Sequence, residues 1–133
     1  LRIARKNLLC HGLTMRAITV QADARKPYAE SSGKYNVILC NPPYIPSAEL
    51  PDLQKEVRQE PRIALDGGAD GLDFYRDIAA CYKSALTRGG ALLLEIGAGR
   101  QNDVESILKD AGYTGISMHK DLTGTIRVVQ AGV

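Results

Sequence analysis

The sequence predicts an α/β fold, built on a mostly parallel sheet that ends in an antiparallel hairpin. Two observations carry this prediction. Short apolar runs alternate with segments of helical periodicity along the 133 residues, and the last two apolar runs are joined by a turn too short for a parallel crossover. One hydrophobic core is expected, with helices on both faces of the sheet.

Periodicity and the residues that end each segment place the elements. The run YNVILC over Tyr35–Cys40 is nearly all apolar, which is typical of a strand covered on both faces. Gly89 and Gly90 are expected to close the longest helix. The expected elements are, in order, a helix over Leu1–Leu13, strands over Ala17–Ala22 and Tyr35–Cys40, a helix from Gly71 to about Thr87, a strand over Ala91–Ile96, a helix around Val104–Ala111, and strands over about Thr114–His119 and Thr125–Ala131.

The composition argues against several classes of function. The formal net charge is +2, and Lys and Arg are scattered among Asp and Glu, whereas a nucleic-acid binder usually concentrates positive charge on one face. Cys10, Cys40 and Cys81 are odd in number and widely spaced, so neither a disulfide framework nor a metal site is indicated. The apolar runs are too short to span a bilayer, and no secretory leader is recognised. A reducing cytoplasm fits best.

The motif Asn41-Pro42-Pro43-Tyr44, directly after an apolar strand, is the most informative feature. Ligands in open α/β sheets bind beyond the carboxyl ends of strands. Proline fixes its own φ and pushes the preceding residue into extended geometry, so Asn41 and Pro42 lie on a stiffened backbone. The Asn41 side-chain oxygen and the Pro42 main-chain oxygen can then accept from one NH2 group. The structural alternative is a proline-rich strand exit, in which Asn41 caps its own turn.

Two such acceptors suit methylation of an amide or an aromatic amine. The lone pair of such a nitrogen is delocalised, so the nitrogen is a poor nucleophile. Acceptors on both N–H bonds orient the nitrogen and stabilise the positive charge that it gains during attack. Tyr44 can stack on a planar substrate group. No strong general base is needed, because the methylated nitrogen loses a proton readily.

The chain resembles the HemK-type protein-glutamine N5-methyltransferases, which use S-adenosyl-L-methionine to methylate the glutamine of the Gly-Gly-Gln loop in peptide chain release factors. The resemblance covers essentially all residues in the family's order. It is carried by the segments IARKNLLCHGL (Ile3–Leu13), NPPYIP (Asn41–Pro46), EVRQEPRIALDGGADGLDFYRDI (Glu56–Ile78), LLLEIGAGRQ (Leu92–Gln101) and KDLTGTIRVV (Lys120–Val129). It implies a class I (Rossmann-like) methyltransferase fold, release factors as protein substrates, and a cytoplasmic enzyme.

The resemblance also implies roles for single residues. Asn41 and Pro42 would hold the glutamine amide, with Pro43 and Tyr44 shaping its slot and Asn41 also facing the cofactor. Asp23 and Ala24 would lie beside the cofactor's adenine, although some relatives have an aromatic residue where Ala24 stands. Glu60 and Pro61 would brace the substrate loop, and an exposed ion pair is the alternative for Glu60. Gly67, Gly68 and Gly71 are expected to serve backbone turns.

By the same comparison, residues 1–133 are expected to form a partial methyltransferase domain. The family's glycine-rich cofactor loop and its N-terminal recognition domain are not found in the sequence, and the first two strands of the sheet are expected to be missing with them. A circularly permuted order, in which Glu95–Gly99 is the cofactor loop, is a weaker alternative. Two further alternatives are an adenine-N6 DNA methyltransferase, which shares the NPPY motif, and a non-catalytic α/β binding module.

A sheet without these strands would leave an apolar edge at Val37–Leu39. The chain is therefore expected either to pair this edge with a second copy or to leave Leu1 to about Ser32 loosely packed. Binding of S-adenosyl-L-methionine by this chain alone is expected to be weak, because the backbone amides that would hold its carboxylate are missing.

Overall fold

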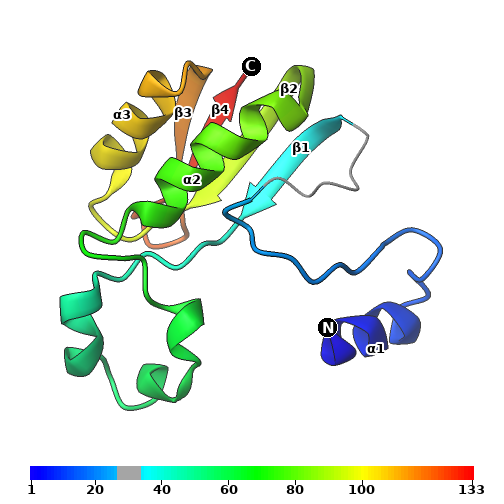
Figure 1. The fold of residues 1–133 in the computed structure, drawn as a ribbon, viewed down its shortest axis with the longest axis horizontal. Coiled ribbons are helices and arrows are strands. Elements are labelled where there is room, and N and C mark those ends of the chain that lie inside the picture. Colours follow the sequence, from blue (N-terminus) through cyan, green and yellow to red (C-terminus); the bar gives the residue numbers. More distant parts are fainter. Residues whose placement is uncertain (27–33) are drawn as a thin grey trace.

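The computed structural model describes residues 1–26 and 34–133 (Figure 1). Among the described residues, the helices are α1 (Arg2–Cys10), α2 (Asp73–Tyr82) and α3 (Gln101–Asp110), and the strands are β1 (Tyr35–Cys40), β2 (Leu86–Glu95), β3 (Thr114–Lys120) and β4 (Ile126–Gly132). Short 3-10 turns occupy Ser47–Asp52, Val57–Gln59, Arg62–Ala64 and Lys83–Ala85. None of the helices in this part of the chain is long and apolar enough to cross a membrane.

The described strands form one sheet in the order β1-β2-β4-β3. β1 and β2 are parallel, with Leu39 opposite Leu93. β4 is antiparallel to both β2 and β3, so the predicted terminal hairpin is confirmed. The prediction of a mostly parallel sheet is wrong for these strands, because two of the three pairings are antiparallel.

The core lies between the sheet and the helices α2 and α3, which cover the same face in Figure 1. Leu92 and Leu94 alternate along β2 and are fully buried on this face, where they meet residues of both helices. The opposite face is open: Val37 is 54% exposed and Leu39 73% exposed. The prediction of helices on both faces is therefore wrong for the described residues, since α1 has no buried residue and lies away from the sheet.

The segment Ala17–Ala22 does not form the predicted strand. A strand needs a neighbour for its backbone N–H and C=O groups, and β1 is the edge of the described sheet with β2 as its partner. Most residues from Leu1 to Lys26 are exposed, in agreement with the expected loose packing, while residues 27–32 of that prediction lie outside the described residues.

The end of α2 also differs from its prediction. The helix gives way to a 3-10 turn at Lys83, and β2 already begins at Leu86. Gly89 and Gly90 therefore lie within β2 instead of closing the helix. The register between β1 and β2 shifts here, since Tyr35 faces Leu86 whereas Val37 faces Ala91. The extra residues of β2 make this end of the pairing irregular.

Candidate active-site loop

The Asn41–Tyr44 turn leaves the carboxyl end of β1, next to the carboxyl end of its parallel neighbour β2. Asn41 is exposed and Pro42 is buried. Asn41 borders a hollow on the open side of the sheet, lined by Leu39, Cys40, Asn41, Leu93, Glu95 and Val128. In the described backbone, no N–H donates to the carbonyl of Pro42, so this oxygen is available as an acceptor.

The residues after the turn are held by the segment Leu65–Gly68, which runs beside them. Ile45 pairs with Asp66 in a single parallel bridge. The Ile45 N–H donates to the Leu65 carbonyl (3.0 Å), and the Gly67 N–H donates to the Ile45 carbonyl (2.9 Å). The Ser47 N–H donates to the Gly68 carbonyl at 2.8 Å. These bonds give the loop a fixed backbone although it belongs to no sheet.

The Asp66 carboxylate strengthens this junction. It accepts hydrogen bonds from the Ser47 hydroxyl (2.6 Å) and from the Gly68 N–H (3.1 Å), and Arg62 pairs with it from four residues away. The hydrogen bond from Ser47, followed by those from Gly68 and Arg62, lowers the pKa of Asp66. Asp66 is therefore ionised at neutral pH, and its two loop contacts are charge-assisted.

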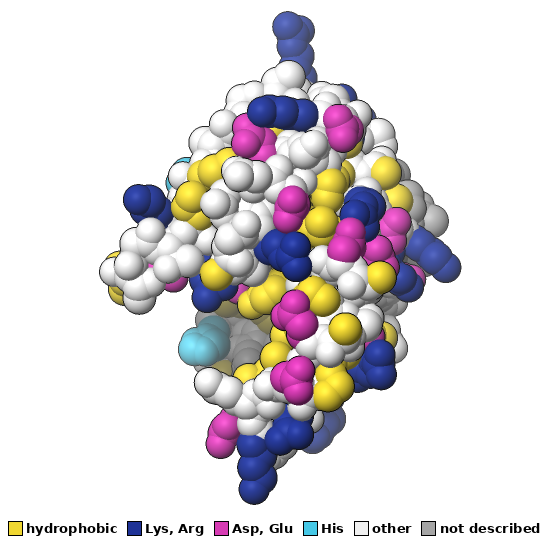
Figure 2. Space-filling model, turned by 90° about the vertical axis from the view of Figure 1, so that its left-hand side faces the viewer, with side chains coloured by type: hydrophobic (Ala, Val, Ile, Leu, Met, Phe, Trp, Pro, Cys, Tyr) yellow, Lys and Arg dark blue, Asp and Glu magenta, His cyan; other side chains and the backbone are white. Residues whose placement is uncertain are grey.

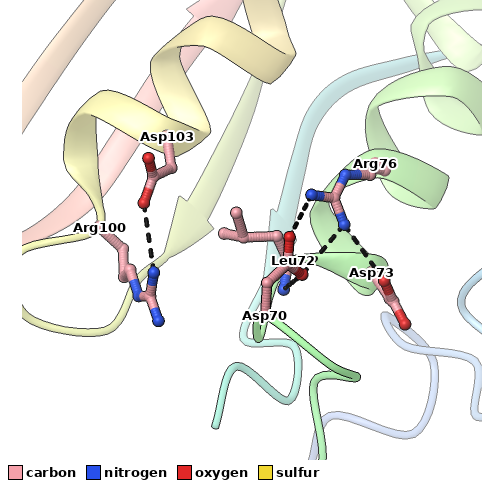
Figure 3. A network of polar contacts seen from close by, with 6 residues as sticks. All are labelled: Asp70, Leu72, Asp73, Arg76, Arg100 and Asp103. Atoms are coloured by element: carbon pink, nitrogen blue, oxygen red, sulfur yellow. Dashed lines mark hydrogen bonds and ion pairs between the residues drawn. The ribbon is translucent and has the colours of Figure 1, made fainter. Parts of the chain in front are cut away.

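A second carboxylate fixes the start of α2 (Figure 3). Asp70 accepts from the Leu72 N–H at 3.0 Å and pairs with Arg76, which also bonds Asp73 at 3.2 Å. The hydrogen bond from Arg76 is the main reason why the pKa of Asp70 falls to about 2. Figure 3 shows a separate pair on α3, between Arg100 and Asp103. Both networks are local to a helix start: the first lies within Asp70–Arg76 and the second within Arg100–Asp103.

Tyr75 ties α2 to the end of β2. Its side chain is fully buried, and its hydroxyl donates to the Glu95 carbonyl at 2.9 Å. Burial raises the pKa of the Tyr75 phenol, so it is protonated at neutral pH. The strand end that this bond secures leads into Gly97, which lies against the Tyr44 ring.

The other predicted site residues lie at exposed positions. Asp23 accepts from the Arg25 N–H (3.0 Å) within its own turn, and this bond is the first cause of its lowered pKa. Ala24 follows in the same turn. Glu60 and Pro61 lie in the loop between two 3-10 turns, and the loop contacts come instead from Leu65–Gly68. The roles of all four residues stay predictions.

Relatives of known name resemble the chain over almost its whole length. It is 41% identical over 131 residues to the release factor glutamine methyltransferase of Rhodospirillum rubrum, covering 98% of this chain and 39% of that protein. It is 38% identical over 132 residues to the enzyme of the same name from Clostridium acetobutylicum, covering 98% and 46%. This chain is a relative of the release factor glutamine methyltransferases. It spans less than half the length of these two enzymes.

Comparison with solved structures confirms the class I methyltransferase fold. A putative O-methyltransferase from Nostoc punctiforme superposes with a TM-score of 0.60 over 99% of this chain and 41% of its own, at 14% identity. No protein-family model matches the chain. This chain thus shares sequence with the release factor glutamine methyltransferases and its fold with a solved methyltransferase structure.

The sequence predicted the position of the Asn41–Tyr44 loop in this chain, but it did not predict most of the residues that hold the loop. Asp66, Tyr75 and Gly97 were not expected to contribute. The glycines after Asp66 were expected to serve turns, and Gly68 and Gly71 do have positive φ values. Gly67 does not, and close packing is the reason for a glycine there. The clustering of glycines around Asp66 was the available signal.

Proposed function

We propose that this chain is part of a methyltransferase that uses S-adenosyl-L-methionine to methylate N5 of the glutamine in the Gly-Gly-Gln loop of peptide chain release factors. The observation that carries the proposal is the identity of 38–41% over 98% of the chain to two enzymes named for this activity. The position of the Asn41–Tyr44 turn, at the carboxyl end of a parallel strand, supports the same conclusion.

The chemistry of the turn fits an amide substrate. The Asn41 side-chain oxygen and the Pro42 carbonyl would each accept a hydrogen bond from one of the two N–H groups of the glutamine amide. Each acceptor fixes the direction of the nitrogen and stabilises its developing positive charge. Because Pro42 is buried and its φ is fixed, its carbonyl needs little reorganisation during the reaction. The proton leaves the nitrogen after methylation and needs no strong base nearby.

The described residues fit the cofactor only in part. S-adenosyl-L-methionine, when bound, supplies a methyl group on a positively charged sulfur. Asn41 is exposed and can face this end, whereas the Asp23 carboxylate is already engaged by Arg25. The permuted alternative is disfavoured, because the Tyr44 ring lies against Gly97 and fills the space beside that glycine. No group of side chains suited to a metal ion occurs among the described residues.

The surface gives little support to a DNA substrate. Figure 2 shows Lys and Arg side chains interspersed with Asp and Glu on the face in view, without a continuous basic stripe. A site for duplex DNA needs clustered positive charge to neutralise phosphates. We therefore propose that the enzyme acts on a protein substrate. Because release factors act in the cytoplasm, we expect the enzyme there as well.

Methyl transfer by the intact gene product tests the proposal. The protein is incubated with S-adenosyl-L-methionine carrying a labelled methyl group and with a purified release factor. Label is expected on the glutamine of the Gly-Gly-Gln loop, and a release factor with Asn at this position is the control. Label in adenine of duplex DNA, or no cofactor binding by calorimetry, would contradict the proposal and favour one of the other two classes.

We also infer that the isolated 133-residue chain self-associates through β1. This strand is the edge of the described sheet, and the side chains of Val37 and Leu39 are more than half exposed beside its free backbone groups. Sedimentation at rising concentration is expected to show dimers, and Val37→Lys should shift the equilibrium to monomers. A compact monomer that binds S-adenosyl-L-methionine at micromolar concentration would contradict this inference.

A further inference from the structure

The Tyr44 residue of the active-site loop is enclosed by glycines from two other segments. We propose that Gly67, Gly71 and Gly97 are positioning residues, whose lack of side chains seats Tyr44 and thereby fixes Asn41 and Pro42. The proposal rests on the proposed function, since it concerns the same loop. It assigns to these glycines a contact role that turn geometry alone does not require.

Gly97 supports the Tyr44 ring. A Cβ atom at Gly97 would lie 3.1 Å from Cδ2 and 3.4 Å from Cε2 of this ring. The φ value of Gly97 is not positive, so its backbone would accept any L-residue. The need for glycine at this position is therefore steric, and it comes from the ring.

Gly67 and Gly71, in the segment that precedes α2, pack closely against the Tyr44 main chain. A Cβ at Gly67 would lie 2.8 Å from the Tyr44 Cα and 2.9 Å from its carbonyl carbon. A Cβ at Gly71 would lie 2.4 Å from the Tyr44 carbonyl oxygen. Gly67 is buried and has no positive φ, which again leaves close approach as the reason for glycine. These are backbone contacts, so no flexible side chain can move aside.

The position of Tyr44 determines the positions of the two acceptors, Asn41 and Pro42, because the chain that links them is stiff. Only Pro43 separates Tyr44 from the Pro42 carbonyl, and both prolines have fixed φ values. Behind Tyr44, the hydrogen bonds between Ile45 and the Leu65–Gly67 segment prevent the loop from yielding outward. A methyl group at Gly67 must therefore move Tyr44 by at least about 0.6 Å, from 2.8 Å to ordinary contact at 3.4 Å. Displacements near 1 Å can lower turnover by roughly 10²-fold.

Alanine substitutions in the intact gene product test the proposal. Gly67→Ala and Gly97→Ala are expected to lower kcat for release-factor methylation by roughly 10- to 100-fold, with a smaller change in KM. Gly124→Ala is the matched control, because Gly124 has a φ of +87° but no atom within 4 Å of its added Cβ. The control should lose stability through backbone strain and keep its kcat. Gly97→Ala is the milder change and keeps the test open where Gly67→Ala does not fold.

A spectroscopic measurement separates this proposal from the proposed function. In protein labelled with 13C-glycine, the ring current of Tyr44 should displace the Gly97 Hα resonances from their values in Tyr44→Leu, which lacks the ring. An inactive wild-type protein that retains the shift would refute the function and leave the contact intact. Absence of the shift, or kcat at the level of the Gly124→Ala control in both glycine variants, would overturn the positioning role.

Discussion

Replacing Tyr75 with Phe tests how the end of β2 is held next to the Asn41–Tyr44 loop. The change removes one oxygen from a fully buried side chain and leaves its ring packing intact. The lost hydroxyl donates to the Glu95 carbonyl at 2.9 Å, in a part-buried position. A net hydrogen bond is worth about 1 kcal/mol, and an acceptor left unpaired adds to the loss. We expect the free energy of unfolding to fall by about 1–2 kcal/mol, which corresponds to a Tm decrease of roughly 4–7 °C for a chain of this size.

Tyr113→Phe provides the matched control for this prediction. Tyr113 is also buried, but its hydroxyl has no hydrogen-bond partner among the described residues. The same chemical change there removes an unsatisfied polar group, so stability should be unchanged or slightly increased. Urea denaturation of both variants measures the difference, with equal m values required for the comparison. Equal losses in the two variants would refute the reasoning that the Glu95 contact stabilises the fold.

Tyr75 also predicts that the stability of the fold decreases at alkaline pH. Burial raises the pKa of Tyr75 in the folded state above its ordinary value of 10.0. The unfolded chain therefore loses this proton first, and stability should fall as the pH rises above 10.0 toward the folded-state pKa. In Tyr75→Phe this slope should be smaller than in the wild type.

Three further predictions follow. In the intact gene product, Asn41→Ala removes one acceptor from the reacting nitrogen, so kcat should fall by roughly 10²–10³, and wild-type turnover would refute the assigned role. Tyr44→Phe should keep most activity because its ring still packs against Gly97, whereas Tyr44→Ala should lose much of it; equal losses would point to the hydroxyl. The pKa of Asp70 is lowered from 3.8 to about 2, so its contribution to stability is present above 3.8 and is lost as the pH falls toward 2. Denaturation of Asp70→Asn across this interval should show a weaker pH dependence, and an unchanged one would contradict the Arg76 pairing; the effect is small because both side chains are about half exposed.

The sequence alone determined the α/β class, the terminal hairpin and the position of the Asn41–Tyr44 loop at the end of a strand. Helical and strand periodicity and the proline pair of Asn41–Tyr44 depend on residues that are neighbours in the chain, so one sequence is enough to read them. The resemblance to the release factor glutamine methyltransferases was likewise carried by continuous segments.

Only the tertiary structure decided how these elements meet. The sequence could not place β4 between β2 and β3, because hydrogen-bonded pairing joins residues far apart in the chain. The strand predicted at Ala17–Ala22 failed for the same reason: its β propensity is local, but a strand forms only where a partner strand accepts its backbone. The glycine at position 67 was expected to make a turn. Its close approach to Tyr44 is seen only in the folded chain, where a Cβ added at Gly67 would lie 2.8 Å from the Tyr44 Cα and steric exclusion leaves no room for a side chain.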